Sequence, residues 1–207
     1  ALTDRQRRYL RMKRGTDMIL SGLALLVLLI PFGVVAALQK LSSPHEPVIF
    51  RQQRVGRNAK TFTMYKFRTM RQQQPGEEKK GWTVKGDPRV TKVGAFLRRT
   101  SIDELPQLFN VLSGEMSIVG PRPERREFIE SYSKIIPEFQ ERLRVKGGLT
   151  GYAQIYGKYS TGPEDKIKYD LIYIYNYSLR MDIRLLFLTI RIFFQKENAQ
   201  GVEESEL

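Results

Sequence analysis

The feature that most constrains this chain is an uncharged, largely apolar run from Met18 to Leu38, MILSGLALLVLLIPFGVVAAL. Its length is about what an α-helix needs to cross a hydrocarbon core of ~30 Å. It is too long for a secretory signal peptide, and no small-residue cleavage site follows it. A buried core helix is disfavoured, because helices that are apolar on every side are rare in a domain of 207 residues. A spanning helix and a re-entrant segment that dips into the bilayer and returns both remain open.

Basic residues flank the apolar run on both sides. They are Arg5, Arg7, Arg8, Arg11, Lys13 and Arg14 before it, and Lys40, Arg51, Arg54, Arg57, Lys60, Lys66 and Arg68 after it. Because cytoplasmic flanks collect Lys and Arg, this pattern favours a re-entrant segment with both ends facing the cytoplasm. Pro31 offers a point for the helix to break, since it removes a backbone hydrogen bond. The carbonyl that Pro31 frees needs a donor inside the lipid, and Ser21 or another polar side chain could supply it.

The composition restricts both the partners and the chemistry. The 35 Lys and Arg outnumber the 22 Asp and Glu, and the net charge of +13 points to an anionic partner: nucleic acid, an anionic membrane surface or a phosphorylated substrate. Nucleic acid is disfavoured because no reading module is present and the aromatic residues lie in apolar stretches. The chain has no cysteine and only one histidine, His45. Disulfides and thiolate metal sites are therefore excluded, and zinc sites and Ser-His-Asp catalysis are strongly disfavoured, which leaves carboxylates, Lys, Arg, Tyr and an oxygen-ligated cation.

Local patterns predict an α+β protein, mostly helical, with one small β-hairpin, an N-terminal re-entrant membrane helix and interfacial amphipathic helices. We expect the basic entry and the membrane segment to occupy residues 1–40 and a cytoplasmic domain at the membrane interface to occupy residues 41–207. The expected elements are a hairpin at 47–70 around a GRNAK turn, an exposed loop at 71–88, a short helix at 90–99, a helix at 105–113 closed by Gly114, a strand at 116–120 and an amphipathic segment at 138–145.

The stretch from 169 to 196, YDLIYIYNYSLRMDIRLLFLTIRIFFQK, is rich in aromatic and aliphatic residues. Arg180, Arg184 and Arg191 fall along one side at helical spacing. A basic stripe on an apolar helix suits the headgroup plane of a membrane. A core helix with a solvated edge would show the same pattern, and we favour the membrane because the chain already has a membrane segment.

Two adjacent acids, Asp103 and Glu104, interrupt a basic region in RRTSIDELPQ. Ser101 and Glu104 have the spacing of a capping box, which needs no function. Pro106 opposes that interpretation, because a helix capped by Ser101 would place it beyond the first turn. A helix that begins near Asp103 would instead place Pro106 among the N–H groups that have no intrahelical partner. Asp103 would then be ionised at the helix mouth beside Arg98, as a nucleophile or a metal ligand.

The stretch GPRPE adds a second basic group to this region. Pro121 and Pro123 are expected to hold Arg122 in an extended, rigid loop after a strand, which suits a bidentate grip on phosphate. A proline-rich surface turn is the plain alternative. Neither a GxGxxG nor a GxxxxGK[ST] loop occurs, so Rossmann and P-loop nucleotide sites are disfavoured.

Five stretches in order resemble the bacterial sugar transferase family, whose members are monotopic phosphoglycosyl transferases that start bacterial glycan assembly. They are the basic-then-apolar segment with Pro31, RVGRNAKTFTMYKFRTM, LRRTSIDELPQLFNVLSGEMSIVGPRPE, VKGGLTGYAQIYGK and YDLIYIYNYSLRMDI, which together extend from about residue 10 to 195. The chain departs from the family pattern in three places. No Ser precedes Pro31, Gly147 replaces a proline, and Tyr152 replaces a tryptophan.

The resemblance implies the catalytic domain of an undecaprenyl-phosphate sugar-1-phosphate transferase. Such an enzyme transfers sugar-1-phosphate from a UDP-sugar to polyprenyl phosphate and releases UMP, in the assembly of O-antigen, capsule, exopolysaccharide or glycoprotein glycans. It implies Asp103 as the nucleophile that forms a phosphosugar ester, and also as a magnesium ligand, with Glu104 as its partner acid. It further implies two more active-site acids, Asp170 and Asp182. The phosphate-binding residues that it implies are Lys66, Arg68, Arg98, Arg122 and Lys158.

The same resemblance implies Mg²⁺ as the cofactor and an inner-membrane location with the catalytic domain on the cytoplasmic face. The expected partners are the nucleotide sugar, the lipid acceptor and membrane lipids, with a homodimer left open. The alternative function is a non-catalytic cationic membrane scaffold, which would be indifferent to Asp103, Glu104 and Mg²⁺. The identity of the sugar cannot be derived, because no motif marks the sugar pocket.

Overall fold

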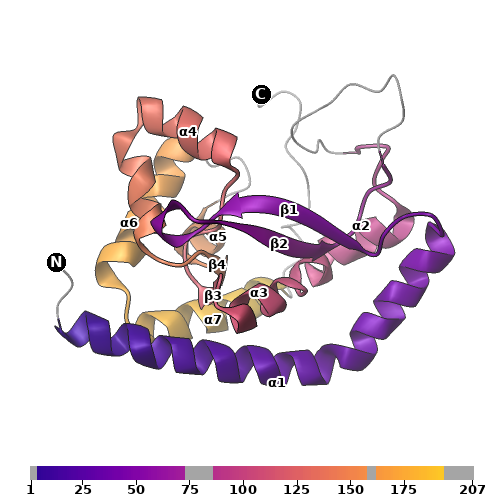
Figure 1. The fold of residues 1–207 in the computed structure, drawn as a ribbon, viewed down its shortest axis with the longest axis horizontal. Helices are drawn as coiled ribbons and strands as arrows, with labels where there is room; N and C mark the ends of the chain where they lie inside the picture. The colour runs from indigo at the N-terminus through magenta and orange to yellow at the C-terminus, as the bar shows by residue number, and fades with distance from the viewer. Residues whose placement is uncertain (1–3, 73–85, 158–161, 194–207) are drawn as a thin grey trace.

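A computed structural model describes residues 4–72, 86–157 and 162–193. It confirms an α+β fold in which long and short helices surround two small sheets (Figure 1). The elements are α1 Asp4–Ser42, β1 Ile49–Val55, η1 Arg57–Ala59, β2 Thr61–Phe67, α2 Lys92–Arg99, η2 Ile102–Glu104, α3 Gln107–Ser113, β3 Ser117–Val119, α4 Arg126–Ile135, η3 Pro137–Arg144, β4 Gly148–Thr150, α5 Tyr152–Tyr156, α6 Pro163–Asn176 and α7 Leu179–Phe193.

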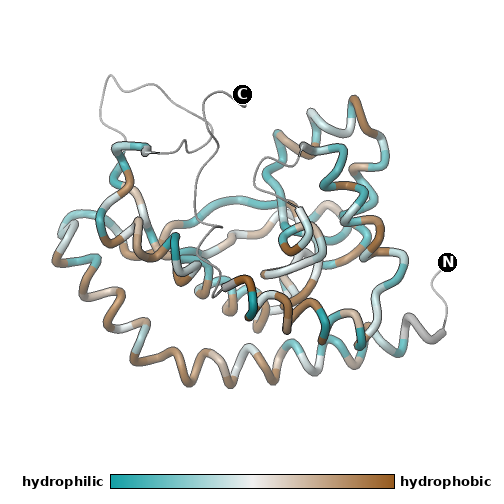
Figure 2. The backbone as a smooth tube through the Cα atoms, turned by 180° about the vertical axis from the view of Figure 1, so that it is seen from behind, coloured by the Kyte–Doolittle hydropathy of each residue, from teal (hydrophilic) through white to brown (hydrophobic). Residues whose placement is uncertain are grey.

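Helix α1 contains the apolar run, and it has the length and composition to cross a membrane. It runs along one side of the molecule and turns toward the hairpin at its C-terminal end, so that the rest of the protein lies on its inner side (Figure 1). Most of its apolar side chains face outward, with Ile30 79 % and Leu41 81 % exposed. In Figure 2 this stretch of the helix is mostly brown, the colour of hydrophobic residues. An apolar surface of this size is unusual for a protein surrounded only by water.

Two expectations about α1 need correction. The helix continues through Pro31 without a break, so the proline does not divide it into two helices. Ser21 is fully buried, and its hydroxyl donates to the carbonyl of Asp17 at 2.6 Å, one turn earlier in the helix. It therefore does not serve the carbonyl that Pro31 leaves without a backbone donor.

Polar side chains fasten the inner face of α1 to the protein body. Asp17 accepts from the hydroxyl of Ser117 at 2.7 Å and from the backbone N–H of Ile118 at 3.1 Å. Further along the helix, the amide of Gln39 donates to the carbonyl of Arg68. These bonds join the first half of α1 to β3 and its second half to the end of β2. The position of α1 along its own axis, relative to the rest of the protein, is thereby fixed at two separate points.

The predicted hairpin is confirmed, with β1 and β2 antiparallel and Ile49 paired with Phe67 at its open end. The connecting turn holds Asn58 and Ala59 at positive φ, and Asn tolerates this conformation well. Phe62 and Met64, two residues apart on one face of β2, are buried in the core, and Phe67 is buried at the end of the strand. Because β2 is packed against the core, the hairpin fixes the position of Lys66 near its open end.

The predicted strand near residue 118 is also confirmed, and it forms a second, parallel two-stranded sheet with β4. A Cβ on Gly148 would lie 2.1 Å from the backbone nitrogen of Gly120, so only glycine allows this close approach. The proximity fixes the start of the loop that follows β3. The C-terminal stretch forms two helices, α6 and α7, and α7 leaves Ile183, Phe187 and Ile190 exposed in an apolar stripe.

The short helices match the sequence pattern except at the acidic pair. Helix α2 forms as expected, and α3 ends at Gly114, which adopts φ +92°. The capping-box interpretation is wrong. Ser101 lies in the left-handed region at φ 51°, and its side chain accepts no hydrogen bond from a backbone N–H of the turn. Asp103 lies in the 3₁₀ turn η2, and α3 begins only at Gln107. Most of the expected exposed loop, residues 73–85, lies outside the described part of the chain.

Replacing Gly94 by Ala tests whether the close approach of α2 to the backbone of Thr69 stabilises the protein. A Cβ at this position would lie 2.0 Å from the carbonyl oxygen of Thr69, and backbone atoms cannot yield as a flexible side chain can. We expect Gly94→Ala to lower the free energy of unfolding by about 3 kcal/mol. Gly15→Ala is the matched control, because Gly15 has open space around it and also lies in a helix. Thermal unfolding in detergent, followed by circular dichroism, should show a fall in Tm for the first variant only.

Candidate active site

Three segments that are distant in the sequence bring their charged side chains together around Glu104. Lys66 on β2 places its Nζ 2.9 Å from Oε1 of this carboxylate. Arg122, in the loop after β3, donates from Nη1 to Oε2 at 2.8 Å and from Nη2 to Oε1. Two predicted cations and one predicted acid thus form a single ion-paired group. A bidentate guanidinium–carboxylate pair of this kind fixes the orientation of the two side chains as well as the distance between them.

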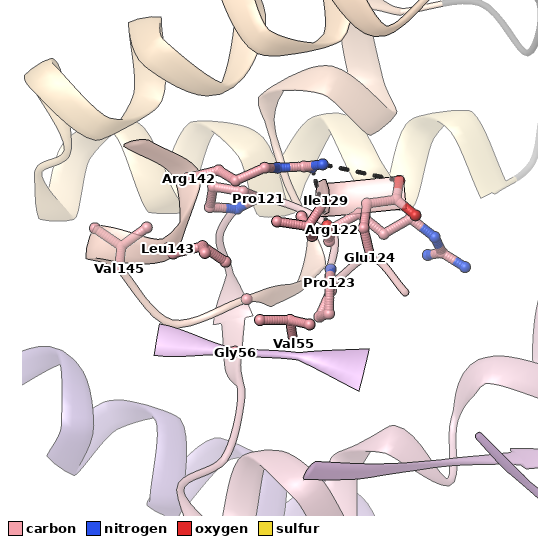
Figure 3. A pocket seen from close by; sticks show the side chains of 11 residues that line it. Val55, Gly56, Pro121, Arg122, Pro123, Glu124, Ile129, Arg142, Leu143 and Val145 are labelled. Carbon is pink, nitrogen blue, oxygen red and sulfur yellow. Dashed lines mark hydrogen bonds and ion pairs between the residues drawn. The ribbon is translucent and has the colours of Figure 1, made fainter. Parts of the chain in front are cut away.

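The loop that carries Arg122 is itself held from behind by Arg142 of η3. Arg142 donates from Nη2 to the backbone carbonyl of Arg122 at 3.0 Å, and the same nitrogen lies 2.8 Å from Oδ2 of Asp170. Figure 3 shows Arg142 reaching over Pro121 toward Glu124, whose carboxylate lies 3.9 Å away. Because Arg142 and Asp170 are almost completely buried, this pair acts as a rigid support for the loop.

Asp103 differs from Glu104 in having no direct partner. Among the described residues, no hydrogen bond or ion pair engages its carboxylate, which is partly exposed. Burial and, to a smaller extent, the negative charge of Glu104 raise the pKa of Asp103 to about 6, against the opposite effect of Lys66, Arg98 and Arg122. The result is a carboxylate that is ionised at neutral pH but not neutralised by contact.

The pKa of Glu104 is shifted in the opposite direction from that of Asp103. Although burial alone would raise its pKa, the charges of Arg122 and Lys66 hold the pKa of Glu104 well below its usual range. It therefore remains a carboxylate at any physiological pH. A group that cannot take up a proton is a poor proton carrier, so the geometry favours Glu104 as the anchor of the two cations.

Arg98 completes the positive surroundings of Asp103. Its Nε donates to the hydroxyl of Thr69 at 2.8 Å, and within the described segments it makes no ion pair with an acid. The close contact between Gly94 and the Thr69 carbonyl brings α2 near enough for this bond. Arg98 is thus positioned by a neutral partner and keeps donors available for an anion.

The other predicted site residues lie in different surroundings. Arg68 donates to the carbonyl of Pro47 at 2.9 Å and lies 3.7 Å from Glu46, away from Glu104. Asp170 supports the Arg122 loop through Arg142. Asp182 is bonded to Tyr9, Lys13 and Tyr173, and so joins α1 to α6 and α7. Lys158 lies outside the described residues.

Sequence reasoning missed two residues that shape this site, Thr69 and Arg142. Thr69 directly follows Arg68 in KFRTM, and that adjacency to a predicted phosphate-binding residue was the available signal. Arg142 lies in a segment that was predicted only to be amphipathic. A buried arginine cannot be distinguished from a solvated one by spacing alone, so no local pattern would have identified it.

The described residues contain no cluster of three His, Asp or Glu side chains that could hold a metal ion, so this part of the chain builds no closed metal cage. Mg²⁺ does not need one, since it commonly binds one or two carboxylates together with substrate phosphates and water. The unpartnered Asp103 carboxylate fits this mode of binding. Glu104 fits it less well, because its oxygens are already occupied by Lys66 and Arg122.

Similarity to known proteins extends over nearly the whole chain. A family model described as bacterial sugar transferase matches residues 8–196. An N-acetylgalactosaminephosphotransferase of Aeromonas hydrophila, named for UDP-N-acetylgalactosamine and undecaprenyl phosphate, is 42 % identical over 88 % of the chain. A UDP-glucose:undecaprenyl-phosphate glucose-1-phosphate transferase of Xanthomonas campestris pv. campestris is 43 % identical over 93 % of the chain. The chain spans 44 % and 41 % of the lengths of these two relatives.

A relative of similar length is also found. The exopolysaccharide production protein PSS of Rhizobium leguminosarum bv. phaseoli is 45 % identical over 86 % of the chain, and the match covers 93 % of that protein. Similarity therefore extends both to long relatives, of which the chain corresponds to a part, and to a short one.

The Glu104→Gln variant tests whether Glu104 keeps the pKa of Asp103 high. Removing the Glu104 charge removes a repulsion and leaves Lys66 and Arg122 to act on Asp103 alone. We expect the pKa of Asp103 to fall from about 6 toward the ordinary aspartate value. The carboxyl chemical shift of Asp103 can be followed by NMR through a pH titration in detergent. An unchanged or higher pKa would contradict the coupling.

Proposed function

The chain belongs to the bacterial sugar transferase family, and on that basis we propose that it transfers sugar-1-phosphate from a UDP-sugar to undecaprenyl phosphate, releasing UMP. The relatives support this proposal, because two of them are named for reactions between a UDP-sugar and undecaprenyl phosphate. The observation that carries it is the carboxylate of Asp103, unpaired and ionised, beside three cationic side chains.

In the proposed first step, a carboxylate oxygen of Asp103 attacks the phosphorus that bears the sugar. The bond between this phosphorus and the bridging oxygen breaks, and UMP leaves with that oxygen. In the second step, a phosphate oxygen of undecaprenyl phosphate attacks the same phosphorus and displaces the carboxylate. Neither step requires a net proton transfer, which agrees with a partner acid, Glu104, that stays ionised.

The three cations have different tasks in this proposal. Arg98 has no acidic partner among the described residues and can bind the diphosphate directly. Lys66 and Arg122 are held by Glu104 at fixed positions, so their positive charges are already in place before the donor binds. Preorganised donors of this kind need little rearrangement as charge develops in the transition state.

We also propose Mg²⁺ as the cofactor, held by Asp103 together with oxygens of the donor diphosphate. When bound, it would supply additional positive charge to the diphosphate. Glu104 would act on it only at a distance, because Lys66 and Arg122 occupy its oxygens.

The acceptor carries its phosphate in the headgroup plane, so the site must lie there too. We propose that α1 enters the cytoplasmic face of the inner membrane and returns to it, and that the apolar stripe of α7 lies in the interface. The turn of α1 toward the hairpin supports re-entry, because the body lies on the inner side of the helix (Figure 1). Basic residues on both flanks agree with this topology.

Replacement of Asp103 by Asn tests the nucleophile. We expect Asp103→Asn to lose UMP release from a panel of UDP-sugars, by at least about a thousandfold for a missing nucleophile. Without the lipid acceptor, the wild type should release about one equivalent of UMP and gain the mass of a phosphosugar at Asp103. Asp165→Asn is the matched control, since Asp165 is an exposed acid whose ion pair within the described residues is with Lys168. Full turnover by Asp103→Asn would rule out this route and favour the scaffold.

The pH dependence of the reaction gives a separate test. A carboxylate nucleophile is active only when deprotonated, so kcat/KM should rise with pH and level off above the pKa of Asp103, about 6. The Glu104→Gln variant, whatever its absolute rate, should show this midpoint at lower pH. Initial rates of UMP release between pH 4.5 and 8 measure both profiles. A midpoint that stays the same in the variant would assign the titration to another group.

A further inference from the structure

A second basic region lies at the other end of the hairpin from Glu104. A hollow of about 440 Å³ opens between the hairpin turn and the end of α3. Its lining includes Arg57 and Lys60 from the turn, Gly114 and Glu115 after α3, and Lys146 before β4. Lys66 lies five residues further along β2 than Thr61, which is roughly 17 Å of extended chain. The hollow is therefore separate from the candidate active site.

Cationic groups from three parts of the chain converge on this hollow. A Cβ built on Gly114 would lie 3.1 Å from Nη2 of Arg14 and 3.5 Å from Nζ of Lys146, so both nitrogens approach the same point. Burial lowers the pKa of Lys146, and the nearby charges of Arg14 and Arg57 lower it further, against the opposite effect of Asp17. Mutual repulsion of this kind is relieved when an anion binds between the cations.

The acid in the hollow does not neutralise these cations. Glu115 accepts from the amide of Asn110 at 2.7 Å and from the hydroxyl of Ser113 at 3.2 Å. Within the described segments, none of Arg57, Lys60 and Lys146 makes an ion pair with a carboxylate. Three cations without acidic partners around a hollow of this volume provide the donors and the space for a phosphate group.

The position of the hollow indicates where that phosphate comes from. Arg14 lies one helical turn before Met18, the first residue of the apolar run, and it donates to the carbonyls of Val111 and Leu112 at the end of α3. Leu112 itself is 38 % exposed beside Gly22 of α1. A lipid whose chains lie against the apolar part of α1 would therefore have its headgroup at the level of the hollow.

We propose that this hollow binds the phosphate of an anionic phospholipid headgroup, as a lipid site that takes no part in the transfer reaction. The proposal depends on the insertion of α1 into a membrane and not on the chemistry of Asp103. Lipid bound there would hold the hairpin turn against the bilayer surface, while the open end of the hairpin carries Lys66.

The test uses the full chain in a neutral detergent, with dihexanoylphosphatidylglycerol as the probe. Its apparent dissociation constant is obtained from the shift of Tm across a titration, followed by circular dichroism. The double variant Arg57→Gln/Lys146→Gln should bind the probe roughly tenfold more weakly, since charge-assisted hydrogen bonds are lost. The matched control, Lys134→Gln/Lys168→Gln, removes the same charge from exposed positions on α4 and α6 and should bind as the wild type does.

Two further measurements make the result specific. Lys146→Arg keeps the charge and should retain binding, while Lys146→Gln alone should weaken it, which covers the case of a double variant that folds poorly. Dihexanoylphosphatidylcholine and inorganic phosphate should bind at least tenfold more weakly than the probe. Equal losses in the double variant and its control would overturn the site, and equal binding of inorganic phosphate would overturn the lipid as its source. UMP release is not part of the readout, so the outcome is independent of the proposed reaction.

Discussion

The ion pairs of Glu104 with Lys66 and Arg122 are the interaction on which the arrangement of this site depends. They join the hairpin, the η2 turn and the loop after β3, three segments that are distant in the sequence. They also divide the available positive charge unequally between two neighbouring acids. Glu104 takes the direct contacts, and Asp103 receives only the longer-range field. Neighbouring acids whose pKa values are pushed apart in this way are suited to different tasks.

This division answers the main difficulty of the proposed reaction. A carboxylate that approaches a diphosphate meets a repulsion of about 4 kcal/mol per charge pair at 4 Å and an effective dielectric constant near 20. A nucleophile locked in its own ion pair would have to break that pair before it could attack. Asp103 avoids this cost because the cations are held by Glu104, by Thr69 or by backbone contacts around them. The positive charge is therefore close to Asp103 without occupying its oxygens.

Local patterns in the sequence were sufficient for those elements whose stability is mainly local. The alternation in β1 and β2, the helix at 92–99 and the glycine that ends α3 were all predicted from neighbouring residues. The start of α3 was not, because the capping-box spacing says nothing of the left-handed conformation that Ser101 adopts. The contacts of Glu104 with Lys66 and Arg122 span 38 and 18 residues, so only the fold itself reveals them. The family resemblance suggested which residues matter, but not which acid holds the cations.

The polar residues inside α1 connect the membrane segment to this chemistry. An apolar helix free in a bilayer can shift along its axis at little cost, and a phosphate-handling site attached to it would shift too. Asp17 and Gln39 prevent this, because each is bonded to the body near an element that carries the site, β3 or the end of β2. Moving α1 by one turn would leave a buried aspartate without its donors, which costs several kcal/mol. In the proposed reaction, the depth of α1 in the bilayer would therefore set the height at which Asp103 meets a lipid phosphate.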